Sequence, residues 1–169
     1  MSLRLAGIAV VGAATAAAFA VPANAETINA QAKAQVVKPL TLSAIQNLDL
    51  GTLLLGPGSW SGATVSLSRS GSLTCPANVT CSGAAMVARY NVAGSNKQTV
   101  IIHAPNVTLV NQSDSTKTLT LVVDSPGSVY LPNSGAPGTN FNLGGSLTLN
   151  STTAAGTYVG TFNVSVEYQ

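Results

Sequence analysis

The chain has very little charge. Of its 169 residues, seven are Lys or Arg, five are Asp or Glu, and one is His. Because there is no basic cluster, the sequence excludes nucleic acid and anionic lipid as partners held by charge. A surface with so few charges also repels other copies of itself weakly, so a modest attractive contact is enough for self-association.

Groups that could carry out catalysis are equally scarce. His103 is the single histidine, so a Ser-His-Asp mechanism would have to combine it with Asp114 or Asp124. No strained GxSxG turn and no metal or cofactor motif occurs. The carboxylates are spaced singly, which disfavours a paired acid and base: Glu26, Asp49, Asp114, Asp124 and Glu167. We expect a protein without enzymatic activity, metal or cofactor, and keep a hydrolase that uses His103 as an alternative.

Aromatic side chains make up only 5% of the residues. Trp60, Tyr90, Tyr130 and Tyr158 could stack on a sugar, but they lie on separate segments and also suit half-buried positions in a sheet. A monomeric secreted binding module, for example for a glycan, is therefore a second hypothesis.

The only cysteines are Cys75 and Cys81, six positions apart. The spacing does not fit a CxxC redox pair, and two cysteines with one distant histidine make a poor zinc site. A local disulfide is the interpretation we adopt, and closing so small a loop stabilises the fold by roughly 2 kcal/mol.

One long apolar run is present, and it lies at the beginning of the chain. Arg4 precedes a small-residue apolar stretch from Leu5 to Ala20, and Ala23 and Ala25 suit cleavage by signal peptidase before Glu26. We predict a secretory signal peptide over residues 1–25 and a single domain over residues 26–169. No later run is long enough for an integral membrane segment. The expected route is export, through the periplasm to the cell surface or beyond.

Short segments with alternating apolar residues follow one another along the rest of the chain. Clusters of Gly, Pro, Asn and Ser divide them at intervals of about 8 to 12 residues, which is typical of antiparallel sandwiches. We predict an all-β sandwich in which Gly144-Gly145 is a bulge or turn and residues 125–138 form a loop. The predicted strands span 27–36, 39–42, 48–55, 63–69, 73–75, 86–92, 98–103, 107–110, 119–123, 139–143, 146–149 and 157–168.

Both ends of the predicted domain are amphipathic. Within residues 26–38 the small apolar side chains fall on one face of a donor or edge strand: Ile28, Ala30, Ala32, Ala34 and Val36. Near the carboxyl end the apolar face comprises Phe162, Val164, Val166 and Tyr168. Such strands can complete their own sandwich, or they can complete the sheet of a neighbouring molecule. The second use is a heterologous contact, which generates open filaments.

Several motifs resemble those of a known family. The segments Pro39-Leu-Thr-Leu42, Leu48-Asp-Leu-Gly51, Gly144-Gly-Ser-Leu-Thr-Leu149 and Ala155–Tyr168 are similar to the bacterial exported domain-of-unknown-function family 4402. The carboxyl end is also similar to spore-coat-U-type and chaperone-usher pilin subunits, because Gly156 is fourteenth from the end and Tyr168 is penultimate.

The resemblance to pilin subunits implies an immunoglobulin-like, pilin-like sandwich whose last strand pairs with a periplasmic chaperone. It also implies delivery to an usher and replacement of the chaperone by the N-terminal segment of the next subunit. We therefore predict a structural subunit of a surface fibre or coat, in a shaft or tip position that the sequence does not specify.

Overall fold

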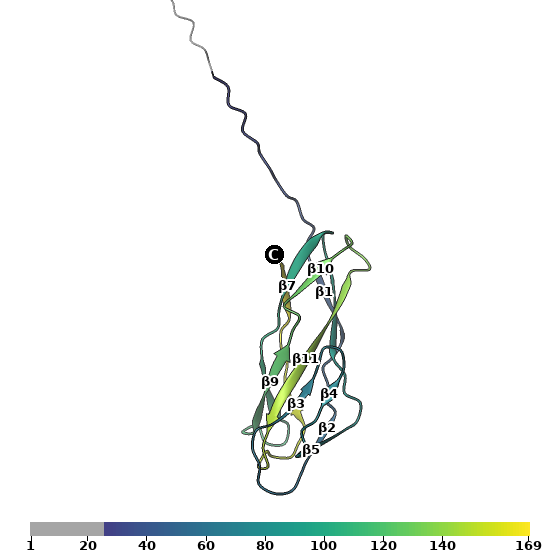
Figure 1. Ribbon diagram of the computed structural model, residues 1–169, viewed down its shortest axis with the longest axis vertical. Helices are drawn as coiled ribbons and strands as arrows, with labels where there is room; N and C mark the ends of the chain where they lie inside the picture. Colours follow the sequence, from purple (N-terminus) through teal and green to yellow (C-terminus); the bar gives the residue numbers. More distant parts are fainter. Residues whose placement is uncertain (1–25) are drawn as a thin grey trace, which may run out of the picture. The chain divides into compact units, whose positions relative to one another are not determined.

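The computed structural model describes residues 26–169, and the predicted signal peptide lies outside them. The chain divides into two units, residues 1–35 and Val36–Gln169, and every strand of the described residues belongs to the second unit (Figure 1). Residues 26–169 contain no helix, so none of them forms a helix that could cross a membrane. The strands are β1 (Thr41–Gln46), β2 (Thr52–Leu55), β3 (Ala63–Leu67), β4 (Leu73–Thr74), β5 (Val79–Ser82), β6 (Ala88–Ala93), β7 (Gln98–His103), β8 (Val107–Asn111), β9 (Thr118–Asp124), β10 (Ser128–Leu131), β11 (Thr139–Leu149), β12 (Tyr158–Val159) and β13 (Ser165–Tyr168).

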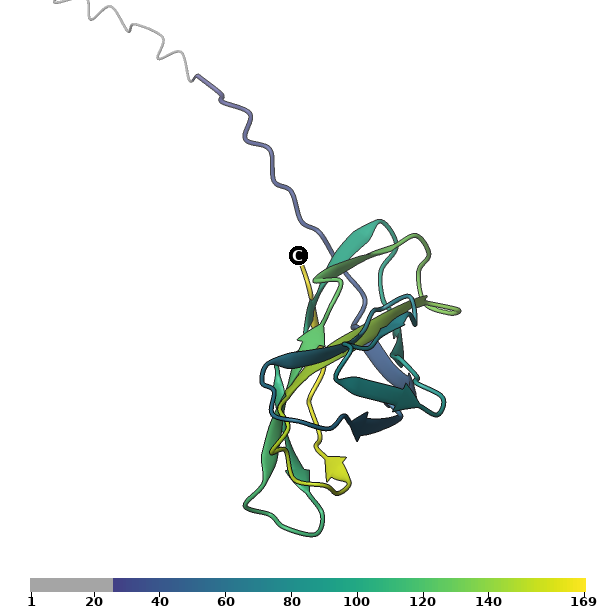
Figure 2. The ribbon, with the colours of Figure 1, turned by 60° about the horizontal axis from the view of Figure 1, so that its bottom comes forward.

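The largest sheet is antiparallel and has the order β1-β6-β11-β9-β8-β12, with β3 and β4 joined to it through β11. The eleven-residue strand β11 organises this sheet (Figure 2). Its first half, residues 139–143, pairs with β6, whereas residues 145–149 pair with β3 and residues 144–147 pair with β9. One strand therefore connects the two halves of the sheet.

Gly144 and Gly145 lie inside β11 and do not separate two strands, so the predicted bulge or turn was wrong. Both residues are buried at the point where the neighbour of β11 changes from β6 to β3. A Cβ on Gly144 would collide with the carbonyl oxygen of Leu67, and a Cβ on Gly145 would lie 2.9 Å from Leu121 Cδ1. Glycine is required at both positions because the neighbouring strands β3 and β9 lie too close to the backbone of β11 to leave space for a side chain.

A three-stranded sheet, β10-β7-β13, packs on the half of the large sheet that contains β6. Each sheet contributes alternate side chains to the shared core, as expected for strands with one buried face. The buried members of this core are Ala88, Val92, Phe141 and Leu143 from the large sheet and Val100, Ile102 and Leu131 from the small one. Two packed antiparallel layers confirm the predicted all-β sandwich.

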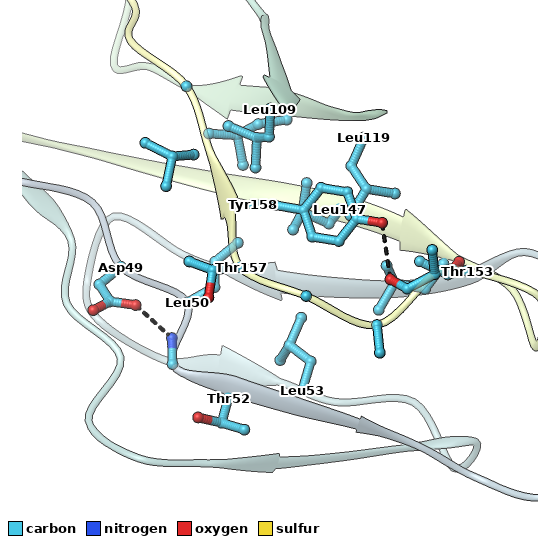
Figure 3. A pocket seen from close by; sticks show the side chains of 18 of the residues that line it. Asp49, Leu50, Thr52, Leu53, Leu109, Leu119, Leu147, Thr153, Thr157 and Tyr158 are labelled. Atoms are coloured by element: carbon cyan, nitrogen blue, oxygen red, sulfur yellow. Dashed lines mark hydrogen bonds between the residues drawn. The ribbon is translucent and has the colours of Figure 1, made fainter. Parts of the chain in front are cut away.

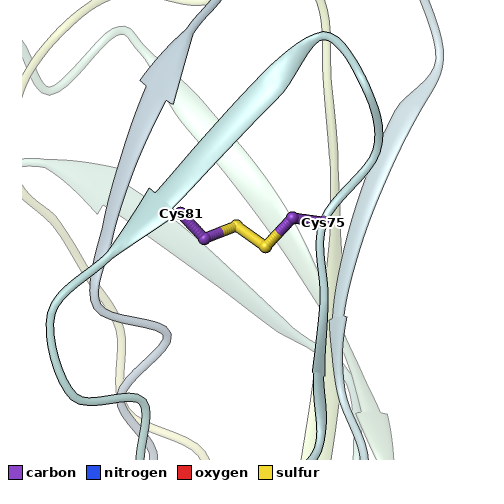
Figure 4. The surroundings of a disulfide bond; sticks show 2 residues. All are labelled: Cys75 and Cys81. Carbon is purple, nitrogen blue, oxygen red and sulfur yellow. A yellow bond between two sulfur atoms is a disulfide. The ribbon is translucent and has the colours of Figure 1, made fainter.

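The other half of the large sheet is covered by a ribbon of two strands, β2 and β5. Val65 of β3, Leu149 of β11 and Val79 of β5 form a second buried cluster there, and Leu53 and Leu55 of β2 pack against it. The ribbon is tied to the large sheet by the predicted disulfide (Figure 4). Cys75 directly follows β4, Cys81 lies in β5, and their Cα atoms are 6.2 Å apart.

Three other predicted elements need correction. Two strands occur where the sequence predicts loops: β5 lies in the disulfide loop, and β10 lies within residues 125–138. Neither segment has a clear strand pattern of its own, and each is ordered by pairing with a neighbour, β5 with β2 and β10 with β7. The segment Thr27–Val36 forms no strand, and its side chains are exposed. The backbone N–H and C=O groups of a strand are paired by hydrogen bonds to a neighbouring strand. This segment therefore forms a strand only when another strand lies beside it.

Candidate functional site: an apolar groove

A groove with a cavity of about 850 Å³ opens on the half of the domain that carries the β2–β5 ribbon (Figure 3). One wall is the segment Leu48–Leu55, and the other runs from Thr153 to Gly160 with Phe162 beyond it. The floor consists of leucines from β8, β9 and β11: Leu109, Leu119, Leu121, Leu147 and Leu149. The groove therefore has an apolar floor between two stretches of backbone.

The first wall has an unpaired edge. β2 pairs with β5 along one side only, and residues 26–169 supply no strand for its other side. Leu53 and Leu55 point inward and are half-buried, whereas Leu54 on the outer face is 65% exposed. The inner face of β2 thus presents apolar side chains beside backbone groups that can pair with an added strand.

The second wall is the carboxyl-terminal segment, which changes from one sheet to the other. β12 pairs with β8 of the large sheet, whereas β13 pairs with β7 of the three-stranded sheet. Residues 160–164 between them belong to no strand. The prediction of one continuous strand over 157–168 was therefore wrong, since no single neighbour runs along the whole segment. The side facing the groove has no partner strand among the described residues.

The predicted alternation of the last residues is nevertheless confirmed. Phe162, Val164, Val166 and Tyr168 are half-buried and pack on the core between the sheets, while the residues between them are exposed. Of the residues predicted for this strand, Gly156 and Phe162 line the groove, and the other three lie beyond its end.

The Tyr168 hydroxyl joins the last strand to the beginning of the domain. It donates to the Lys38 carbonyl oxygen at 2.6 Å and accepts from the Ser95 backbone N–H at 2.8 Å. The Lys38 N–H in turn donates to Ser95 Oγ at 2.6 Å. Both backbone groups of Lys38 are therefore hydrogen-bonded, which fixes the residue where the N-terminal segment joins the domain.

Asn111 holds the second wall in place. It is 2% exposed, and its Nδ2 donates to the Ala155 carbonyl oxygen at 3.0 Å. Its Oδ1 accepts from the backbone N–H groups of Ser113 and Asp114. Gly156 has a φ of +144°, and a Cβ there would lie 2.6 Å from Asn111 Oδ1. The fourteenth residue from the end is thus a glycine because Asn111 occupies the space of a side chain.

The family model described as "Domain of unknown function (DUF4402)" matches residues 40–168. The chain belongs to this family. The match extends from one residue before β1 to the last residue of β13, so it contains both walls and the floor of the groove. It leaves residues 26–39 outside. No curated protein and no solved structure matches the chain.

The predicted donor residues lie outside the DUF4402 match, and Ile28 is 86% exposed and Val36 94% exposed. Ala30, Ala32 and Ala34 between them are exposed as well. Their pairing with another molecule stays a prediction.

His103, the residue required by the hydrolase alternative, lies exposed at the end of β7 of the DUF4402 domain. Its Nε2 is 2.9 Å from Glu167 Oε1, and among the described residues its ring is hydrogen-bonded to no serine. Asp124 instead pairs with Arg69 at 3.1 Å. Asp114 accepts hydrogen bonds from the side chain and backbone of Thr116, which lower the pKa of its carboxyl group.

The four aromatic candidates for sugar stacking are used separately in the DUF4402 domain. Tyr90 stacks on Phe141 with ring centroids 5.6 Å apart, and burial raises the pKa of its phenol. Trp60 Nε1 donates to the Gly56 carbonyl oxygen, and the Tyr158 hydroxyl donates to that of Ala154. Tyr130 is 54% exposed. The structure does not gather them into one platform.

Sequence reasoning missed Asn111 and the leucines of the groove floor. Asn111 opens a glycosylation sequon, a pattern too frequent in this chain to single it out. One signal was available for the first wall: Leu53-Leu54-Leu55 is apolar without interruption, which exceeds what a strand with one wet face requires.

Proposed function

We propose that this protein is an exported structural subunit of a bacterial surface fibre or coat, in which the segment Thr27–Val36 of one copy completes the groove of the next. The observation that carries the proposal is the apolar groove itself, which lies between two stretches of backbone that lack a partner strand on the facing side. A strand is the one ligand shape that satisfies both stretches of backbone and covers an apolar floor at the same time.

The size of the groove suits this occupant. A strand within a sandwich takes up roughly 160 Å³ per residue, from a rise of about 3.3 Å, a strand spacing of about 4.8 Å and a sheet spacing of about 10 Å. A cavity of about 850 Å³ therefore holds roughly five residues of an added strand. Five residues direct two or three side chains to the floor.

The N-terminal segment has the right pattern for the groove. Its small apolar side chains recur at every second position, and leucines already project from the floor, so alanines let the added backbone approach closely. Ile28 and Val36 are almost fully exposed, and a five-residue stretch that includes one of them buries it, which stabilises the contact by about 1.5–3 kcal/mol. Hydrogen bonds to the two walls add about 0.5–1.5 kcal/mol each.

Export and assembly partners belong to the same proposal. The predicted signal peptide and the Cys75–Cys81 disulfide suit an oxidising compartment outside the cytoplasm. An empty apolar groove exposes the subunit to aggregation, so a periplasmic chaperone and an usher are the partners we propose for transit. The low charge of the chain opposes self-association only weakly.

Size-exclusion chromatography with light scattering tests the proposal on residues 26–169, beside a version that lacks residues 26–36. We expect the longer protein to form polymers that resist SDS and the shorter one to stay monomeric. Ala32→Asp places a charge on the apolar face and should stop polymerisation, whereas Gln31→Asp, on the polar face, is the matched control and should not. A longer protein that stays monomeric at high concentration would refute the proposal.

A further inference from the structure

We infer that Asn111 is the positioning residue of the groove, the side chain that sets the second wall at the place where an added strand can pair with it. This inference rests on the proposed function. Asn111 is the only polar residue that is buried among those the structure describes. It lies at the end of β8, directly opposite Tyr158 of β12 in the register of the two strands.

The side chain divides its two polar atoms between two tasks. Oδ1 closes the turn after β8 by accepting from Ser113 N at 2.8 Å and from Asp114 N at 3.3 Å. Nδ2 donates to Ala155 O, which belongs to the groove wall. The turn and the wall are therefore connected through a single amide group. A substitution that removes only its donor releases the wall and keeps the turn.

The wall has few other attachments at this point. Gln112 N donates to Thr157 O at 2.9 Å, and β12 itself pairs with β8 through only two residues. Gly156 lies between the two attached carbonyl groups, and its missing side chain is what lets Asn111 reach Ala155. Loss of the Nδ2 bond would leave the Ala155 carbonyl without its partner and the wall free to shift.

A shift matters because strand pairing is demanding in distance. Neighbouring strands lie about 4.7–4.9 Å apart, and their hydrogen bonds weaken steeply when the donor angle departs from linearity. The wall beside the added strand must therefore lie in the right position before the strand binds. Otherwise binding has to order the wall, which lowers the affinity. Asn111 provides this order from beneath the wall, out of contact with the added strand.

The test uses Asn111→Asp, which keeps the oxygen that accepts from Ser113 and Asp114 but removes the donor to Ala155. The matched control is Asn106→Asp. Asn106 is exposed, its Oδ1 likewise accepts a backbone N–H, from Val123 at 3.0 Å, and it does not line the groove. The acceptor is the unit Val36–Gln169, which contains every described strand and both core clusters. The probe is a fluorescent peptide of residues 26–37, followed by anisotropy.

We expect Asn111→Asp to bind the peptide several-fold to about tenfold more weakly, the effect of losing one well-placed hydrogen bond. Asn106→Asp should bind like the unaltered unit. Equal affinities of all three would overturn the inference and leave the proposed function standing. An unaltered unit that does not bind the peptide would instead overturn the proposed function.

A double-mutant cycle covers the case in which Asn111→Asp does not fold. Gly156→Ala places a methyl group against the Asn111 side chain and should weaken peptide binding. In an Asn111→Ala background the methyl group no longer meets the Asn111 side chain and only the strain of the positive φ at Gly156 remains, so the same Gly156→Ala change should cost several-fold less affinity. A cost that is equal in both backgrounds would show that Gly156 acts independently of Asn111 and would overturn the inference.

Discussion

Removing the disulfide is the perturbation whose effect on both the fold and the groove can be worked out from the structure. Cys81 lies in β5, directly opposite Leu53 of β2, and Leu53 lines the groove. Cys75 follows β4, at the edge of the large sheet. The bond therefore anchors the ribbon that forms the first wall, and the double substitution Cys75→Ser/Cys81→Ser releases it.

The expected loss of stability follows from the loop that the bond closes. With a sequence separation of six, the loop-entropy estimate gives about 2 kcal/mol. For a domain of this size, that corresponds to a fall in Tm of roughly 6–10 °C. The ribbon keeps its contacts with the second core cluster through Leu53, Leu55 and Val79. The double variant should therefore fold, with a less firmly held wall.

Urea denaturation measures this effect, with the fluorescence of Trp60 as the reporter. Trp60 is the single tryptophan and packs against the same cluster, and circular dichroism follows the whole domain in parallel. The double variant should lose about 2 kcal/mol and bind the peptide of residues 26–37 more weakly. Unaltered protein under reducing conditions serves as the control and should behave like the variant.

Two results would refute this reasoning. A loss below about 0.5 kcal/mol, the size of an ordinary surface substitution, would show that the ribbon is held by packing alone. An unchanged affinity for the peptide would show that the disulfide does not support the groove wall. The second result would leave the stability estimate intact.

Three further predictions concern the domain outside the groove. Tyr168→Phe removes the donor to the Lys38 carbonyl oxygen and should cost about 1–2 kcal/mol in urea denaturation; an unchanged midpoint would contradict it. Gly144→Ala forces its methyl group against the Leu67 carbonyl oxygen and should cost about 3 kcal/mol or prevent folding, measured by the yield and Tm of the purified variant. Because burial raises the pKa of Tyr90, its contribution to stability is complete below its ordinary value of about 10 and is lost at higher pH. Tyr90→Phe should therefore lose less stability than the unaltered protein between pH 9 and pH 12.

The parts of the fold that the sequence predicts well are those whose pattern is local. β7 has the predicted bounds, residues 98–103, because four consecutive side chains, Thr99 to Ile102, are β-branched. β11 was predicted as two pieces because Gly-Gly normally ends a strand. The structure shows why this one does not: the carbonyl oxygen of Leu67 needs the space at Gly144. That contact joins residues far apart in the sequence, so no local pattern reports it.

The groove illustrates the same limit. Its carboxyl-terminal wall was predicted in part, from Gly156 and Phe162, because both belong to a terminal motif. Its floor combines the consecutive strands β8 and β9 with β11, which only the sheet order places beside them. Asn111 was not predicted because its importance arises from burial and from one bond to Ala155. Neither property is visible in a chain rich in asparagine, serine and threonine.

The positions of the groove and of Lys38 allow one copy to bind the segment of a second copy. Lys38 is held at Tyr168, whereas the groove ends at Phe162, six positions earlier in the same segment. Six residues of extended chain span roughly 20 Å. A segment that folded back from Lys38 would first pass Val164 and Val166, which already pack on the core, and its residues 27–31 would then reach the groove. The segment of a second copy can enter the groove with any of its residues. Because Lys38 and the groove are separate places on the domain, one copy can donate and accept at the same time, which is the condition for an open chain of subunits.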